Sequence, residues 1–322
     1  MVDGTRRGRL LAMKLLALAR DHGATHDLQP VPFALGAGAV AAGQGWVLLD
    51  ERQQRGLGPA VAWALRAGVD RLQILADHGT GTLARRAAAF RMPIEVWHVD
   101  DRAVLPAIAE PLTEPAQLPS EDHDLRALIV AGGAVPTVES GVLVGEVRGL
   151  EVCRVVNDAQ TGVARLEVGI GQHDREAFQM LHGDVPTVEA LAKVVATVAP
   201  HRQPNAAPHP LNRLAQERAL RARLIDEPEL IGASHVEVWP SPVERTSLKD
   251  IQPCVARAVI EGGRRTVVVS SGVDLDVVPF ATDARLATGD PTLIVVRSRD
   301  MMPVQTEISS LLVDPIPFVP VG

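Results

Sequence analysis

The sequence predicts an α/β fold, and three observations support this prediction. Helical and strand-like segments alternate near the N-terminus, apolar strands with short turns follow in the middle, and the alternation returns near the C-terminus. The first region predicts a parallel βαβαβ unit of Rossmann-like type. The rest predicts an α/β region with a central antiparallel meander, helices and a C-terminal parallel strand–helix pair.

The N-terminal segments are placed by their periodicity. A helix is expected over 6–22, strands over 46–49, 72–76 and 94–99, and further helices over 57–67 and 82–90. Short strands joined by helices of this length are typical of parallel strands with right-handed crossovers. The glycine-rich run 36–45 precedes its strand instead of following it. We therefore expect a flexible loop there and not a dinucleotide-binding turn.

A proline-rich, acidic stretch over 106–124 has the composition of a linker. We therefore expect a Rossmann-like domain over 1–118 and a mixed α/β domain over 119–322. The second domain is predicted to hold strands over 128–131, 141–147, 150–156, 164–170, 266–270 and 292–296, and helices over 174–181, 187–199, 211–225, 274–287 and 303–312. The final residues are expected to form a tail or an edge extension. No residue-level repeat relates the two ends of the chain.

Composition and charge narrow the class of protein. The net charge of −7 gives no global attraction to nucleic acid. Cys153 and Cys254 stand in apolar segments without zinc-ligand spacing, which indicates small buried side chains in a reducing compartment. No apolar run reaches the ~18 residues that a membrane span needs. We expect a soluble cytoplasmic protein, and the preference for arginine over lysine indicates a GC-rich, bacterial genome.

A glycine-containing junction between a strand and a helix is the first candidate site. Gly79 and Gly81 allow backbone N–H groups to approach an anion at the start of the helix, and Arg85 or Arg86 adds positive charge. We expect a phosphate-bearing ligand to bind here. The residues of this predicted cradle are Gly79, Thr80, Gly81, Thr82 and Arg85. The alternative is an ordinary turn in which Thr80 or Thr82 caps the helix.

Acidic residues follow three neighbouring predicted strands and form the second candidate. These are Asp50 with Glu51, Asp77 with His78, and Asp100 with Asp101. Ligands of parallel sheets bind at the carboxyl ends of the strands, where carboxylates suit Mg²⁺ or ribose hydroxyls. The alternative is that these residues cap helix N-termini.

The predicted meander carries the third candidate. Glu151 and Glu167 lie within strands and are expected to face each other across a hairpin, where their like charges need a cation or an arginine between them. A divalent-metal site with Mg²⁺ or Mn²⁺ is the first reading, with His173 or Asp174 as acid/base residues at the end of the strand. The alternative is a solvated face on which arginines neutralise the glutamates, with Asp174 as the cap of the next helix.

Residues 141–182 resemble the core of PD-(D/E)XK nucleases, in which acidic residues on consecutive meander strands precede a helix. The resemblance implies that Glu151 and Glu167 stand for the acids of that family. Such nucleases place a lysine two residues after the acid of the third strand, and this chain has Gly169 there.

Two further segments carry charge or small polar residues. Ser270, Ser271 and Gly272 follow one C-terminal strand, and Arg297 and Arg299 follow the next, a pattern that suits an anion or simple capping. The helix expected over 211–225 carries four arginines, which we interpret as a solvated face because base-stacking aromatics are scarce.

The sequence therefore predicts a protein that binds phosphate-bearing ligands, either nucleotides or nucleic acid. It would be a metal-dependent, nuclease-like hydrolase or a degenerate version of one. The rival prediction is a non-catalytic scaffold or interaction protein, oligomeric, with the leucine-faced helix within 7–18 as its docking element. Residue pattern alone does not decide whether the chain is an enzyme.

Overall fold

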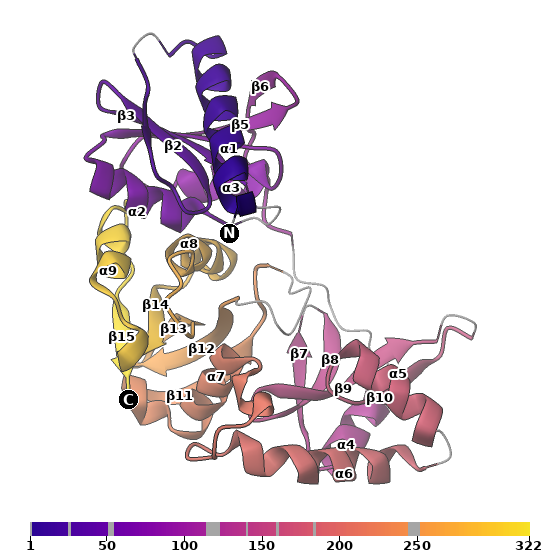
Figure 1. Ribbon diagram of the computed structural model, residues 1–322. Coiled ribbons are helices and arrows are strands. Elements are labelled where there is room, and N and C mark those ends of the chain that lie inside the picture. The colour runs from indigo at the N-terminus through magenta and orange to yellow at the C-terminus, as the bar shows by residue number, and fades with distance from the viewer. Residues whose placement is uncertain are drawn as a thin grey trace. The chain divides into compact units, whose positions relative to one another are not determined.

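The computed structural model describes residues 2–24, 27–50, 55–113, 123–139, 141–158, 161–182, 185–243 and 252–322 (Figure 1). Two compact units are present. Unit 1 comprises Met1–Leu112, Val273–Leu286 and Met301–Phe318, and unit 2 comprises Thr113–Gly272, Ala287–Asp300 and Val319–Gly322. The domain boundary predicted at 118 and 119 lies outside the described residues and stays a prediction. The predicted α/β class is confirmed, with three separate sheets in the described residues.

The first sheet belongs to unit 1 and follows chain order. Its strands are β1 (Gln29–Val31), β2 (Gly36–Ala41), β3 (Gln44–Leu49), β4 (Arg71–Ala76), β5 (Ile94–Asp100) and β6 (Ala103–Pro106), and its helices are α1 (Val2–Asp21), α2 (Leu57–Ala67) and α3 (Thr80–Ala87). Strands β3, β4 and β5 are parallel, as predicted. The finer Rossmann-like arrangement is not confirmed, because β1, β2 and β6 are antiparallel additions to a sequentially ordered sheet.

The glycine-rich run 36–45 was expected to be a flexible loop, and this expectation is wrong. It forms strand β2, the turn that follows, and the start of β3. Gly38 and Gly45 are needed because the indole of Trp63, on α2, lies against the sheet. A Cβ atom at Gly38 would stand 2.7 Å from that ring, and one at Gly45 would stand 2.9 Å from it. The run is glycine-rich because of close packing and not because of a ligand.

Helix α1 covers its own sheet. Leu15, Leu18 and Ala19 are buried in a core with residues of β2, β3 and β4. The leucine face predicted as a docking element is therefore used inside unit 1. Leu10 and Met13 remain more than half exposed on the same helix.

The second sheet is the predicted antiparallel meander, in unit 2. It consists of β7 (Val135–Glu139), β8 (Val142–Val147), β9 (Leu150–Asn157) and β10 (Ala164–Val168), accompanied by helices α4 (His123–Ala131), α5 (Gly171–His182) and α6 (Thr187–Val198). The strand predicted over 128–131 is wrong, because these residues end α4. Leu125, Leu128 and Ile129 contact the core of this sheet at helical spacing.

The third sheet contains the predicted parallel pair. Its strands are β11 (Ala233–Trp239), β12 (Cys254–Ile260), β13 (Gly263–Val269), β14 (Thr292–Arg297) and β15 (Phe318–Val321), and the helices of this part are α7 (Gln216–Asp226), α8 (Val277–Thr288) and α9 (Pro303–Ser310). Strands β13 and β14 are parallel. Short 3-10 helices occupy Ala199–Arg202, Pro210–Arg213, Pro228–Ile231 and Ser298–Asp300.

The first and third sheets share one order of elements. A helix, three antiparallel strands, a helix, a strand, a helix and a strand follow one another from α1 to β5 and again from α7 to β15. In both, the third of the antiparallel strands pairs in parallel with the strand that follows the next helix: β3 pairs with β4, and β13 pairs with β14. We call these stretches module 1 (residues 2–100) and module 2 (residues 216–321). The repeat is evident in the topology and not in residue identities.

Candidate functional site

Helices of the two modules meet within unit 1. Phe90, just after α3, forms an antiparallel bridge with Leu312, just after α9. The backbone N–H of Arg91 donates to Leu311 at 2.8 Å, and that of Val313 donates to Ala89 at 2.9 Å. The bridged residues hold equivalent positions in the two modules, and their hydrogen bonds are reciprocal. Reciprocal contacts of this kind are typical of an interface with two-fold symmetry.

The predicted phosphate-binding arginine is part of this meeting. Arg85 donates to both carboxylate oxygens of Asp283, on α8, over 2.9 and 3.1 Å, and Arg86 donates to the same carboxylate over 2.7 Å. Only 1% of the Asp283 surface is exposed. A buried carboxylate held by two guanidiniums is a charge-assisted structural contact.

The remaining cradle residues lie at the start of α3. Gly79 is the N-cap in a left-handed conformation, so the expected capping by Thr80 or Thr82 is wrong. A Cβ atom on Gly81 would stand 2.2 Å from the side chain of Glu110, whose backbone N–H donates to the Gly81 carbonyl. The side chain of Glu110 thus packs against Gly81, which brings negative charge close to the predicted cradle. Phosphate binding by Gly79, Thr80, Gly81 and Thr82 stays a prediction.

Two aspartates of the loop before α8 bind the start of α2. Asp276 accepts hydrogen bonds from the backbone N–H groups of Gly56, at 2.8 Å, and Gly58, at 2.9 Å. Asp274 accepts from Arg55 at 2.7 Å. Burial raises the pKa of Asp274 to about 6, although Arg55 opposes this shift. The second carboxylate oxygen of Asp274 is buried without a hydrogen-bond partner.

In unit 2, an arginine lies between the two predicted catalytic glutamates. Glu151, which is 1% exposed, accepts from Arg154 at 2.9 and 3.0 Å and from Arg175 at 3.1 Å. Arg175 also lies 3.8 Å from Glu167, which accepts from Arg165 at 2.8 Å. The structure therefore brings the two glutamates together around a guanidinium. Arginines neutralise both glutamates, as the alternative expected, but the face is not solvated at Glu151, which is buried. A metal role for Glu151 and Glu167 stays a prediction.

His173 and Asp174 do not join the glutamates. The His173 side chain is fully exposed, 3.7 Å from Glu176. The Asp174 carboxylate accepts from the backbone N–H of Ile170 at 2.6 Å, which stabilises the start of α5. Their acid/base roles stay predictions that no contact in the described residues supports.

Two of the acidic residues at the strand ends of unit 1 have different partners. Asp50 pairs with Arg7 at 2.6 Å, and Asp77 lies 3.7 Å from His78. Glu51 lies outside the described residues. Across the described ranges, no three His, Cys, Asp or Glu side chains gather in a group that could hold a metal ion.

The C-terminal junctions meet at a residue that the sequence did not single out. Gln216, on α7, accepts from the hydroxyl of Ser271 at 3.1 Å and from Arg297 at 3.2 Å. The backbone N–H of Gly272 donates to Asp300 at 2.9 Å. Burial and the nearby Arg299 lower the pKa of Arg297. These polar groups bond to one another, whereas the buried hydroxyl of Ser270 has no hydrogen-bond partner. Anion binding at these junctions stays a prediction.

Helix α7 was interpreted as a solvated basic face, and this interpretation is wrong for two of its arginines. Arg218 and Arg221 are 4% and 1% exposed. Arg221 donates to Glu139 at 2.7 Å, and Arg218 lies 3.5 Å from Glu146. Burial raises the pKa of Glu146, and Arg221 and Arg218 oppose this shift. The four residues form a buried ion network between strands β7 and β8 and helix α7, all within unit 2.

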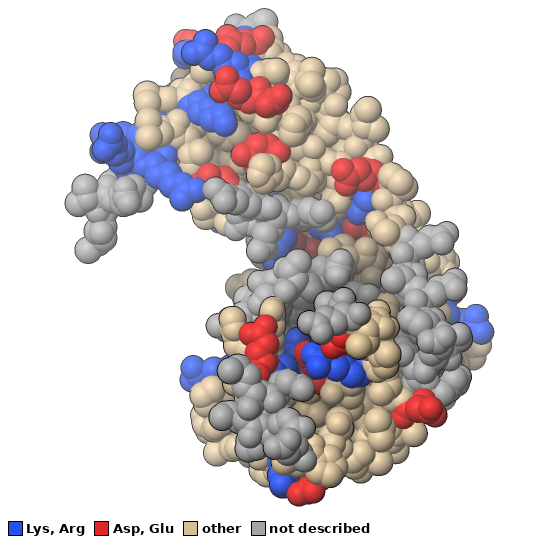
Figure 2. Space-filling model, turned by 90° about the vertical axis from the view of Figure 1, so that its right-hand side faces the viewer, with Lys and Arg blue, Asp and Glu red and all other residues tan. Residues whose placement is uncertain are grey.

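On the face drawn in Figure 2, several basic side chains lie beside acidic ones. None of the helices in the described part of the chain is both long and apolar enough to cross a membrane.

Comparison with known proteins found no matching family model, no matching curated protein and no matching solved structure.

Proposed function

We propose that this chain is a non-catalytic interaction protein whose charged side chains hold its own modules together. The observation that carries the proposal is the contact of Arg85 and Arg86 with Asp283. The arginine expected to bind phosphate is bound to a carboxylate of the same chain, and the side chains of Arg85 and Asp283 are 12% and 1% exposed. An external anion would have to compete with Asp283, which also holds Arg86, for the Arg85 guanidinium.

Two further clusters support this proposal. Arg175 neutralises Glu151 and lies near Glu167, and the buried network of α7 neutralises Glu139 and Glu146. The exposed Leu10 and Met13 of α1 offer an apolar surface for a partner protein.

A metal-dependent, nuclease-like hydrolase is the rival proposal. One observation favours it, namely that both glutamates approach the same guanidinium. A divalent cation at the place of Arg175 would meet the same pair of carboxylates.

Thermal melting of the full chain with Mg²⁺, Mn²⁺ and ATP tests the two proposals. A ligand that binds only the native state raises the melting temperature. The interaction-protein proposal expects that these ligands leave the melting temperature of wild type unchanged, and that they likewise leave the melting temperature of Glu167→Gln unchanged. A rise with Mg²⁺ that is lost in Glu167→Gln would support the hydrolase and overturn our proposal.

A further inference from the structure

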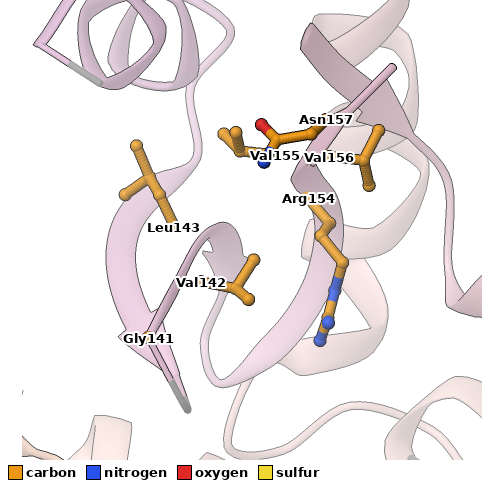
Figure 3. Close-up of a pocket in the computed structure, with 7 residues that line it drawn as sticks. All are labelled: Gly141, Val142, Leu143, Arg154, Val155, Val156 and Asn157. Carbon is orange, nitrogen blue, oxygen red and sulfur yellow. The ribbon is translucent and has the colours of Figure 1, made fainter. Parts of the chain in front are cut away.

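Strands β8 and β9 separate at one end of the meander. Their pairing reaches from Val147 with Leu150 to Val144 with Arg154 and goes no further. Both strands continue, but β8 then pairs with β7 and β9 pairs with β10. A pocket of about 290 Å³ lies where they diverge (Figure 3). It is lined by Val142 and Leu143 from β8 and by Arg154, Val155, Val156 and Asn157 from β9.

One wall of this pocket carries backbone polar groups. The Val152 carbonyl accepts from Gly169 at 2.8 Å, and the backbone N–H of Asp158 donates to Val163 at 3.0 Å, so even-numbered residues of this strand face β10. Alternate residues of an antiparallel strand direct their backbone groups to opposite neighbours. Val155 and Asn157 therefore direct theirs toward β8, the side on which the pocket opens.

Arg154 brings the positive charge to a pocket that is otherwise lined by apolar side chains, by Asn157 and by backbone polar groups. Its guanidinium holds Glu151 and is 34% exposed, whereas Arg175, which holds the same carboxylate, is 10% exposed. Because Glu151 has this second guanidinium, Arg154 can turn toward an anion without leaving a buried charge unpaired. The shared carboxylate makes Arg154 the cation of this cluster that is best suited to a ligand.

We propose that the pocket between β8 and β9 binds a small organic anion with a branched aliphatic body. Val142 and Val156, which share the face of Arg154, contact the body, and Arg154 binds a carboxylate or phosphate head group; Leu143 and Val155 belong to the core behind the pocket. The volume of about 290 Å³ suits a short aliphatic acid. This site is independent of the proposed function, since it uses neither Asp283 nor the pairing of the modules.

Isothermal titration of the full chain tests the proposal with three probes: 4-methylpentanoate, 3-methylbutyl phosphate and the uncharged 4-methylpentanamide. We expect saturable binding of at least one anion and at least tenfold weaker binding of the amide, since a charge-assisted contact is lost. Preference for the carboxylate or for the phosphate identifies the head group. Equal binding of the amide, or no saturable binding of either anion, overturns the proposal.

Variants assign the contacts. Arg154→Gln should weaken anion binding at least tenfold, whereas Arg165→Gln removes a neighbouring arginine that does not line the pocket and should bind as wild type does. Val142→Phe fills the pocket from a half-buried position and should abolish binding with an unchanged circular dichroism spectrum. Wild-type affinity in both Arg154→Gln and Val142→Phe would place the ligand elsewhere and refute the assignment.

Discussion

Phe90 and Leu312 form a bridge between equivalent positions of module 1 and module 2. The flanking hydrogen bonds, from Arg91 to Leu311 and from Val313 to Ala89, repeat one contact in both directions. Within unit 1, the residues that follow α3 and those that follow α9 therefore contact each other reciprocally. Arg85 and Arg86, at the end of α3, and Asp283, on α8, form a second contact between the two modules within unit 1.

Asp283→Asn removes the charge that both arginines neutralise. Loss of one partner from a buried ion pair destabilises proteins by about 3–5 kcal/mol, and we expect a loss of that order in urea unfolding. Asp314→Asn is the matched control, because this carboxylate pairs with Arg285 but is 77% exposed. It should change stability by less than ~1 kcal/mol. Equal effects of the two substitutions would show that Asp283 is not a structural partner.

The pKa of Asp274 predicts an unusual pH dependence of stability. Burial raises the folded-state pKa to about 6 from 3.8. Between these values the folded state keeps a proton that the unfolded state has lost, so stability falls as the pH rises and levels off above about pH 6. The decrease should approach about 3 kcal/mol. Unfolding free energies from pH 3.5 to 7 should lose this component in Asp274→Asn, and parallel pH profiles would contradict the assignment.

Gly58→Ala should lower the stability of the protein, whereas the same substitution at a helical glycine with open space around it should raise the stability. A Cβ atom at Gly58, on α2, would stand 2.1 Å from the carbonyl oxygen of Leu275. Gly58→Ala should therefore destabilise by about 1–3 kcal/mol through overpacking. Gly8→Ala, on α1, meets nothing within 4 Å and should stabilise by about 0.5–1 kcal/mol. Stabilisation by Gly58→Ala in thermal melting would show that α2 does not approach the loop before α8.

Both cysteines should be unreactive in the native state. Burial raises the pKa of Cys153 and of Cys254 to about 12, so the reactive thiolate is scarce at neutral pH. Iodoacetamide should label neither residue in buffer and both in urea, as measured by mass spectrometry. Rapid native labelling of either thiol would contradict its burial.

Local patterns predicted much of the fold. The helix expected over 57–67 has those bounds, because its apolar spacing is helical and Gly68 ends it in a left-handed conformation. Strands β11 and β12 were not predicted, although Ala233–Trp239 alternates between buried or half-buried and exposed residues along part of its length. That period-two signal was present in the sequence.

The contacts of the charged residues could not be predicted, because their partners are distant in the chain. Arg221 and Glu139 are 82 residues apart, and Arg85 and Asp283 are 198 apart. The position of an arginine on a helix does not reveal whether its side chain is buried. It also does not reveal which distant carboxylate the side chain contacts. The pairing of Glu151 with Arg154 does not follow from strand geometry either, since residues three apart on a regular strand point to opposite faces. A register shift between β8 and β9 near Glu151 brings the two side chains together.

A double-mutant cycle on Arg85 and Asp283 tests the central claim most directly. The unfolding free energies of wild type, Arg85→Gln, Asp283→Asn and the double variant give the coupling between the two side chains. We predict a coupling of at least ~1 kcal/mol, as for buried residues in direct contact. A coupling of zero would contradict the claim that Arg85 stabilises the contact between the modules through Asp283. The predicted role of Arg85 in phosphate binding would then be the remaining proposal.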